Sequence, residues 1–174
     1  VWKAKEDAMR EEKRLSEAQL NAKDSYGSKQ IFSSDAAFAI LTNEYFDIED
    51  RARTLGFTVA AVDDNIYNWN VKMYNFGGES GARIEQALNG PLMQRFGYKY
   101  VELSVSFALD LYPFYPPRVK VLRPRLCGNV MSKVAGMKRL KLDFWDFTQS
   151  MSAVLTAVKQ VIEAGASVDV DSEY

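Results

Sequence analysis

The stretch FALDLYPFYPPRVKVLRP, residues 107–124, decides the fold of this chain. Three of its prolines, Pro113, Pro116 and Pro117, fall within five residues. Proline fixes φ and has no N–H to donate, so it cannot continue the hydrogen-bond ladder of a sheet. The cluster therefore predicts a stiff corner where the chain leaves one strand and enters the next. On sequence alone the corner has two interpretations, a rigid turn or a direct contact with a partner.

Strands are predicted on both sides of the corner. Apolar and polar residues alternate over 101–109, and Val119 and Val121 continue the sheet after the prolines. This alternation is the period of a half-buried strand. A further alternating segment covers 67–74, and a short β-branched run at 56–62 precedes it. These segments together predict a meander of neighbouring strands.

Helices are predicted at both ends of this meander. Apolar residues at spacings of three and four line one face over 38–52, with Asp35 as the N-cap and Gly56 as the stop. A second apolar face covers 151–162 and closes at Gly165. Strands grouped between helices favour an α+β domain. We therefore expect an antiparallel four-stranded sheet flanked by helices.

The remaining segments complete the predicted organisation. Residues 82–96 are expected to form a short surface helix inserted in a hairpin and interrupted at Gly90-Pro91, because proline breaks a helical hydrogen bond. The chain is then divided into a charged helical extension at 1–24, a linker at 25–34, the α+β domain at 35–165 and an acidic tail at 166–174. We expect the tail to be loosely held.

Composition narrows the function classes. A net charge of -1 gives no general attraction to nucleic acid, so protein partners are expected instead. The apolar runs are too short to span a bilayer, which predicts no membrane insertion and a cytoplasmic or nuclear location. The chain has no histidine and one cysteine, Cys127, so common zinc sites and histidine-based catalysis are not expected. No metal or cofactor is predicted.

The extension at 1–24 is a candidate attachment segment. It has twelve charged residues of both signs and few apolar ones, which is typical of a solvated helix. Trp2 and Met9 stand seven residues apart, about two helical turns, and so share one face. Such a pair can anchor a helix in a partner groove. The alternative is a frayed helix without a partner.

The corner resembles that of ubiquitin-conjugating enzymes. Members of that family carry a Tyr-Pro-Phe-x-Pro-Pro element, which residues 112–117 match, and residues 35–165 follow the family's order of elements. The insertion after the second strand is most similar to the branch called Q. The resemblance implies that Phe114 contacts ubiquitin ligases. The alternative is that Phe114 packs on the first helix. We take Tyr112 as a second candidate partner-binding residue, although a tyrosine that opens a proline corner is also expected to pack inward.

The family's catalytic cysteine has no counterpart here. The family has His-Pro-Asn, then seven residues, then the cysteine, with a tryptophan eight residues further on. Aligning Asn129 and Trp145 with this pattern places Met137 at the nucleophile's position, and matching the local Leu-Cys-Leu-Asp pattern places Lys141 there. Transthiolation needs a thiolate, which neither residue supplies. Lys141, natural or engineered, would accept ubiquitin once and keep it.

Two other residues of this region, Cys127 and Asn129, stand at positions of the family's motif. Cys127, at the family's histidine position, is a candidate displaced nucleophile but is expected to be a small buried residue. Asn129 is expected to anchor the loop by a hydrogen bond from its side chain to nearby backbone.

The preferred hypothesis is a non-catalytic ubiquitin-conjugating-enzyme-like protein that binds ubiquitin, a ligase or a large assembly. The alternatives are an active or lysine-trapped conjugating enzyme, and a purely structural subunit.

Overall fold

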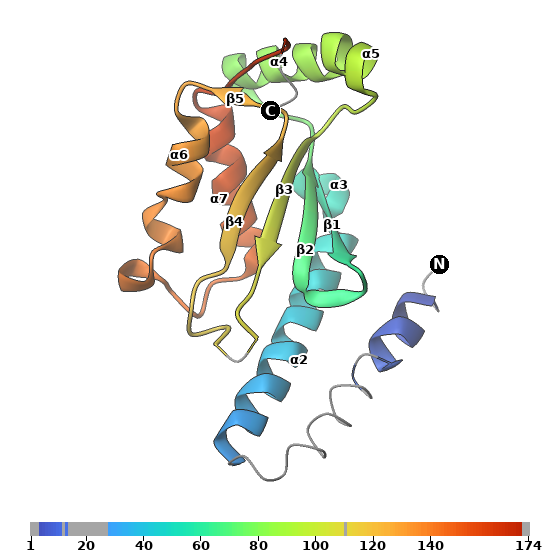
Figure 1. The fold of residues 1–174 in the computed structure, drawn as a ribbon, viewed down its shortest axis with the longest axis vertical. Coiled ribbons are helices and arrows are strands. Elements are labelled where there is room, and N and C mark those ends of the chain that lie inside the picture. The colour runs from blue at the N-terminus through green and yellow to red at the C-terminus, as the bar shows by residue number, and fades with distance from the viewer. Residues whose placement is uncertain (1–3, 12, 14–27, 110, 172–174) are drawn as a thin grey trace.

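The computed structural model describes residues 4–11, 13, 28–109 and 111–171. Its centre is an antiparallel four-stranded sheet in the order β1-β2-β3-β4. The strands are β1 (Phe57–Val62), β2 (Asn65–Met73), β3 (Val101–Ser106) and β4 (Arg118–Arg123). Helices α2 (Ser28–Asp50) and α7 (Met151–Glu163) cover one face of this sheet (Figure 1). The predicted α+β class and meander topology are confirmed.

The core lies between the sheet and these two helices. In β3 the burial alternates residue by residue, and the inward side chains meet those of β2 across the ladder, where Trp69 pairs with Val105 and Val71 with Leu103. All four are buried completely. Adjacent side chains of a strand point to opposite faces, so the alternation in the sequence became an inward and an outward face.

Helix α7 closes the core from behind and follows its sequence pattern closely. The Ser150 hydroxyl oxygen accepts the Ala153 N–H at 3.3 Å and so caps the helix. Its apolar stripe is buried against the sheet and α2, and comprises Met151, Val154, Leu155, Val158 and Ile162. A serine cap followed by apolar residues three and four apart is enough to specify such a helix.

Helix α2 begins earlier than expected. It starts at Ser28, so Asp35 lies inside it and the predicted N-cap is wrong. The linker predicted at 25–34 is helical from Ser28 onward, and its residues 25–27 lie outside the described residues. The serines there resemble a linker, but the segment 28–34 contains no Gly or Pro to stop a helix. At the other end, the chain passes through Arg51 into the short helix α3 (Ala52–Leu55) and stops at Gly56, which adopts φ 75°.

The insertion between β2 and β3 is larger and more buried than predicted. It runs as one continuous helical path through α4 (Gly78–Ala87), η1 (Leu88–Leu92) and α5 (Met93–Phe96). Pro91 does not interrupt it, because the wider turn of η1 spares the hydrogen bond that proline cannot make. Ile84, Leu88 and Leu92 are buried completely, so the insertion is part of the core rather than a surface feature.

The tail is better held than an acidic composition suggested. Residues Ser167–Val168 form β6, which pairs with β5 (Leu126–Cys127) in a second small sheet. The Asp169 N–H donates to the Arg125 carbonyl at 3.0 Å. Among the residues that the structure describes, no helix is both long and apolar enough to cross a membrane. A small helix, α6 (Val130–Ala135), follows β5 and leads into the site region.

Two glycines of the insertion give a matched prediction about stability. A Cβ added at Gly81 would lie 2.7 Å from the Phe76 carbonyl carbon, which is backbone and cannot move aside cheaply. We expect Gly81→Ala to lower the free energy of unfolding by about 1–3 kcal/mol. Gly90→Ala, in the same helical path with nothing within 4 Å, should instead raise it by about 0.4–1 kcal/mol. Urea unfolding of the two variants measures both signs, and two changes of equal sign would contradict the packing of α4 on Phe76.

Candidate functional site

The proline corner joins β3 to β4 and is anchored to the domain by a buried tyrosine. Tyr112 is 2% exposed, and its hydroxyl donates to Glu44 Oε2 on α2 at 2.7 Å. Its ring also packs edge-on against Phe107, with 4.9 Å between ring centroids. The inward packing expected for Tyr112 is therefore observed. Because the side chain is inaccessible, Tyr112 does not serve as a direct partner contact, and that part of the sequence prediction is wrong.

The carboxylate under the corner is electrostatically unusual. Burial raises the pKa of Glu44, although the hydroxyl of Tyr112 and the backbone N–H of Met151 act in the opposite direction by donating to the carboxylate. Burial also raises the pKa of Tyr112, which keeps the phenol protonated and able to donate. Sequence reasoning missed Glu44, because a helical pattern does not show which carboxylate accepts a hydrogen bond from a tyrosine distant in the sequence.

A second tie connects the corner to the segment after α6. The indole N–H of Trp145 donates to the Pro113 carbonyl at 2.7 Å. This segment consists of η2 (Lys138–Leu140), η3 (Leu142–Phe144) and the loop to Ser150. The contact holds the segment that follows α6 against the corner.

The corner and the segment after α6 also carry a pair of exposed aromatic side chains. Phe114 is 61% exposed and Phe147 is 55% exposed, and their ring centroids lie 5.7 Å apart. The possibility that Phe114 packs on the first helix is therefore excluded. Sequence reasoning missed Phe147, whose only signal was an aromatic residue placed between polar neighbours soon after Trp145.

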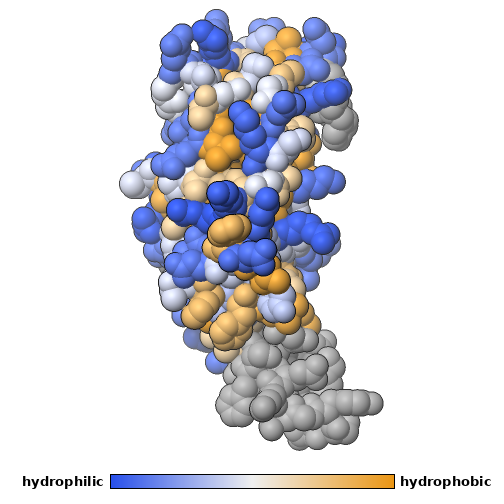
Figure 2. All heavy atoms as spheres, turned by 90° about the vertical axis from the view of Figure 1, so that its left-hand side faces the viewer, coloured by the Kyte–Doolittle hydropathy of each residue, from blue (hydrophilic) through white to orange (hydrophobic). Residues whose placement is uncertain are grey.

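Other exposed apolar residues of the corner loop extend this surface. We call the corner patch the set Leu109, Leu111, Phe114, Tyr115 and Phe147, all of them well exposed. Figure 2 shows hydrophobic side chains gathered toward this end of the molecule on the face it presents. Exposed apolar groups that cluster instead of scattering mark interaction sites. The patch can bury aromatic surface against a partner without any chemical step.

The two predicted nucleophile positions are displayed on the segment beside the corner. Met137 precedes η2 and is half-buried against the core, whereas Lys141 is exposed between η2 and η3. Neither supplies a thiol in either alignment of the family pattern. The amine of Lys141 is exposed to solvent, but the thioether of Met137 has no S–H group and cannot form a thiolate.

Cys127 lies elsewhere. It is exposed in β5, not buried as expected, and its strand pairs with β6. Cys127 and Met137 stand at opposite ends of the six-residue helix α6, which is about 9 Å long. Figure 1 shows β5 at the upper end of the sheet and the segment after α6 near the corner at the lower end. The position of Cys127 thus gives no support to a displaced nucleophile.

Asn129 shapes the loop with its backbone rather than its side chain. It adopts φ 60° at the start of α6, a left-handed conformation that asparagine tolerates well, and its side chain makes no cap hydrogen bond. Its carbonyl accepts the Lys133 N–H at 2.9 Å. The expected side-chain anchor is therefore wrong.

The described part of the N-terminal extension lies against the domain. Residues 4–11 are helical, and Lys5 forms an ion pair with Glu49 of α2. Met9 lines a hollow of about 80 Å³ together with Tyr45 and Ile66 of the domain. Met9 therefore lies beside residues of the domain itself, and its contact to a partner stays a prediction. Trp2 lies outside the described residues.

One buried cation was not anticipated. Lys159 of α7 is 8% exposed, and its Nζ donates to the carbonyls of Leu55, Gly56 and Asn75 at 3.1–3.4 Å. Burial lowers the pKa of this amine. It satisfies carbonyls at the end of α3, where a positive charge is favourable. We assign it a structural role. Within the described ranges, no group of three or more His, Cys, Asp or Glu side chains is placed to hold a metal ion.

The pKa of Glu44 predicts a pH dependence of stability. A carboxyl group whose folded pKa is raised binds its proton more tightly in the folded state, so stability falls as pH rises from its ordinary value of 4.5 through the raised value. Glu44→Gln keeps an acceptor for Tyr112 and removes this titration. We expect the stability of the natural chain relative to Glu44→Gln to decline over that window in urea unfolding at successive pH values. A difference that is constant with pH would contradict a raised pKa.

Comparison with known proteins assigns the fold. No protein-family model matches the sequence. A probable ubiquitin-conjugating enzyme E2 of Acanthamoeba polyphaga mimivirus is 20% identical over 154 residues, which is 87% of this chain and 10% of that protein. The ubiquitin-conjugating enzymes E2 Q1 of Mus musculus and Homo sapiens are each 26% identical over 155 residues, 87% of this chain and 36% of theirs. The chain thus spans about a third or less of these relatives' length.

A solved structure agrees with these relatives. The ubiquitin-conjugating enzyme E2 of Plasmodium falciparum superposes with a TM-score of 0.51 at 19% identity, covering 72% of this chain and 82% of that one. The chain therefore has the ubiquitin-conjugating-enzyme-like fold, as the corner motif predicted. The match to the Q1 relatives agrees with the resemblance to the Q branch.

Proposed function

We propose that this chain is a non-catalytic ubiquitin-conjugating-enzyme-like module that docks a ubiquitin ligase, alone or within a large assembly, through the corner patch. The observation that carries the proposal is the combination of exposed aromatic rings at the corner with the lack of a thiol at Met137 and Lys141. In this proposal the corner patch is the docking surface, and ubiquitin transfer does not follow because neither position offers a thiol nucleophile.

The physical case for docking rests on the rigidity of the patch. Phe114 stands on a loop that is tied at Tyr112 and, through Pro113, at Trp145. Rings held in place before binding lose little conformational entropy when a partner covers them. Aromatic residues are also enriched among the residues that dominate binding energy. A preformed aromatic pair of this kind fits a groove on a protein partner in the cytoplasm or nucleus.

The test is a binding assay against a panel of ubiquitin ligase domains, with ubiquitin as a separate ligand. We expect at least one ligase domain to bind the natural chain, and Phe114→Ala and Phe147→Ala each to weaken that binding by about tenfold or more, since truncating a central aromatic costs about 2 kcal/mol. Leu142→Ala, at a residue that is 54% exposed but outside the patch, is the matched control and should bind normally.

The outcomes separate the hypotheses. Loss of binding in the two phenylalanine variants but not in Leu142→Ala supports docking at the corner. Binding to ubiquitin or a ligase that neither phenylalanine variant weakens would place the interface elsewhere and overturn the proposal. If no member of the panel binds, the role of a purely structural subunit replaces it.

A further inference from the structure

A second surface feature lies away from the corner patch, between α7 and the end of α2. It is a hollow of about 430 Å³, a volume within the range of small-ligand sites. We call it the α7 hollow. The lining residues that matter for recognition are Arg51, Leu55, Arg139, Ser150, Thr156 and Gln160. They come from the turn after α2, from α3, from η2 and from the first turns of α7.

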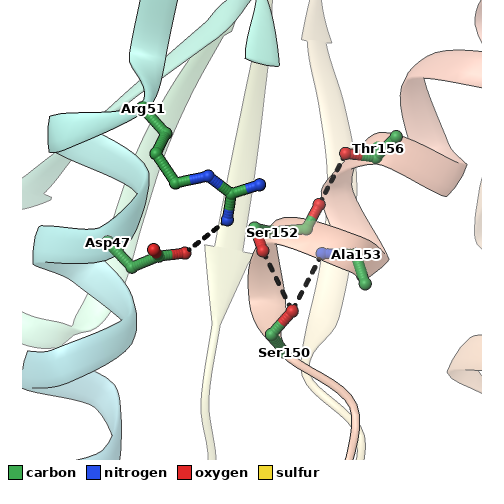
Figure 3. Close-up of polar contacts among 6 residues, drawn as sticks. All are labelled: Asp47, Arg51, Ser150, Ser152, Ala153 and Thr156. Carbon is green, nitrogen blue, oxygen red and sulfur yellow. Dashed lines mark hydrogen bonds and ion pairs between the residues drawn. The ribbon is translucent and has the colours of Figure 1, made fainter. Parts of the chain in front are cut away.

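Two guanidinium groups from different elements define the charge of the hollow. Arg51 donates through Nη1 to Asp47 Oδ2 at 2.9 Å, and Figure 3 shows its side chain reaching from the α2 side toward α7. Arg139 reaches it from η2 and donates through Nη1 to the Ala153 carbonyl at 3.5 Å. A guanidinium has five N–H donors, so each arginine keeps donors beyond these contacts. With Asp47 counted, these three groups leave one net positive charge.

The hydroxyl groups of the hollow are already engaged with one another. Ser150 Oγ accepts the Ala153 N–H and lies 2.9 Å from Ser152 Oγ, and the Thr156 hydroxyl donates to the Ser152 carbonyl at 2.7 Å (Figure 3). The N-terminus of α7 is therefore capped by Ser150, and its backbone N–H groups are not the binding group. Recognition falls to the two arginines, with the Gln160 amide beside them and Leu55 and Ala157 as apolar wall.

We propose that the α7 hollow binds a phosphate monoester, whose oxygens are held by Arg51 and Arg139. Planar guanidinium groups match the oxygens of a phosphate and bind them through paired hydrogen bonds, better than a point charge does. The apolar wall takes the organic group that carries the phosphate. This site shares no residue with the corner patch and is independent of the proposed ligase docking.

The same chemistry can come from a free small phosphate ester or from a phosphorylated side chain of a protein, and the test separates the two. Phenyl phosphate, a short phosphoserine peptide, the unphosphorylated peptide and inorganic phosphate are titrated into the full chain while backbone amide resonances of 150–160 are followed by NMR. We expect saturable shifts with at least one of the two monoesters, and no shifts with the unphosphorylated peptide. The tighter of the two monoesters identifies the source.

Variants locate the binding group. Arg51→Gln and Arg139→Gln should each raise the dissociation constant by about tenfold, because each removes a charge-assisted hydrogen bond to the phosphate. Arg83→Gln is the matched control, since Arg83 forms the same kind of exposed i,i+4 ion pair with Glu79, at 3.0 Å, that Arg51 forms with Asp47. It should leave binding unchanged. The proposal is overturned if neither monoester gives saturable shifts, if inorganic phosphate binds as tightly as both, or if Arg83→Gln weakens binding as much as the other two.

Discussion

Tyr112→Ala is expected to lower the free energy of unfolding by about 3–5 kcal/mol, the usual cost of truncating a buried aromatic side chain. The ring of Tyr112 fills the space between Phe107 and α2, and its hydroxyl is the donor to Glu44. Truncation therefore leaves a cavity and a buried carboxylate without its partner, and both effects destabilise the fold. Phe114→Ala should change stability by no more than about 0.5 kcal/mol, because its ring is mostly exposed.

Urea unfolding of both variants and of Tyr112→Phe measures the separate contributions. Tyr112→Phe keeps the ring and removes the hydroxyl, so it should lose about 1–3 kcal/mol, the cost of an unpaired buried acceptor. The order of stability is then natural chain and Phe114→Ala first, Tyr112→Phe next and Tyr112→Ala last. Equal losses for Tyr112→Ala and Phe114→Ala would contradict the division of the corner into a buried support and an exposed contact.

The parts of the fold that sequence predicted correctly are those where one periodicity governs a whole element. The alternation through Trp69 and Val105 could be satisfied only by a two-faced strand, and the stripe of α7 only by a helix packed on one side. The corner could be predicted from the sequence for a related reason. Proline restricts the backbone locally, so its effect does not depend on what lies nearby in space.

The errors arose where a single residue type or composition was taken to decide the local structure. Serines at 33–34 suggested a linker, yet α2 runs through them, and Pro91 suggested a break, yet a wider turn accommodates it. The acidic residues after Gly165 suggested a loose tail, yet β6 is held by pairing with β5. Only for β6 is the deciding partner distant in sequence, and propensity is a weak guide against such a contact.

The site was predictable only in part for the same reason. The resemblance of residues 112–117 to the family's motif led to Phe114. Phe147 and Arg139 carry no motif, and they become interesting only when the fold brings Phe147 to Phe114 and Arg139 to Arg51 across the first turns of α7. Likewise Lys159, a charge in an apolar stripe, has an explanation only once the carbonyls at the end of α3 are placed around it.

The chain is expected to form no reducible thioester with ubiquitin when supplied with activating enzyme and ATP. A thioester bond needs a thiolate at the acceptor, and the segment that the family uses for this purpose holds Met137 and Lys141 instead. The one thiol, Cys127, lies at the far end of α6 from that segment. Non-reducing electrophoresis with and without thiol reductant is the measurement.

Four variants make this prediction decisive. Met137→Cys and Lys141→Cys each restore a thiol, and a reducible ubiquitin band in one of them but not in the natural chain would show that the rest of the machinery survives and which alignment is correct. A reducible band in the natural chain that Cys127→Ala abolishes would overturn the non-catalytic proposal. A band that resists reductant and disappears in Lys141→Arg would instead establish a trapped conjugate, because an amide formed on a lysine amine is not exchanged by thiols, whereas a thioester is.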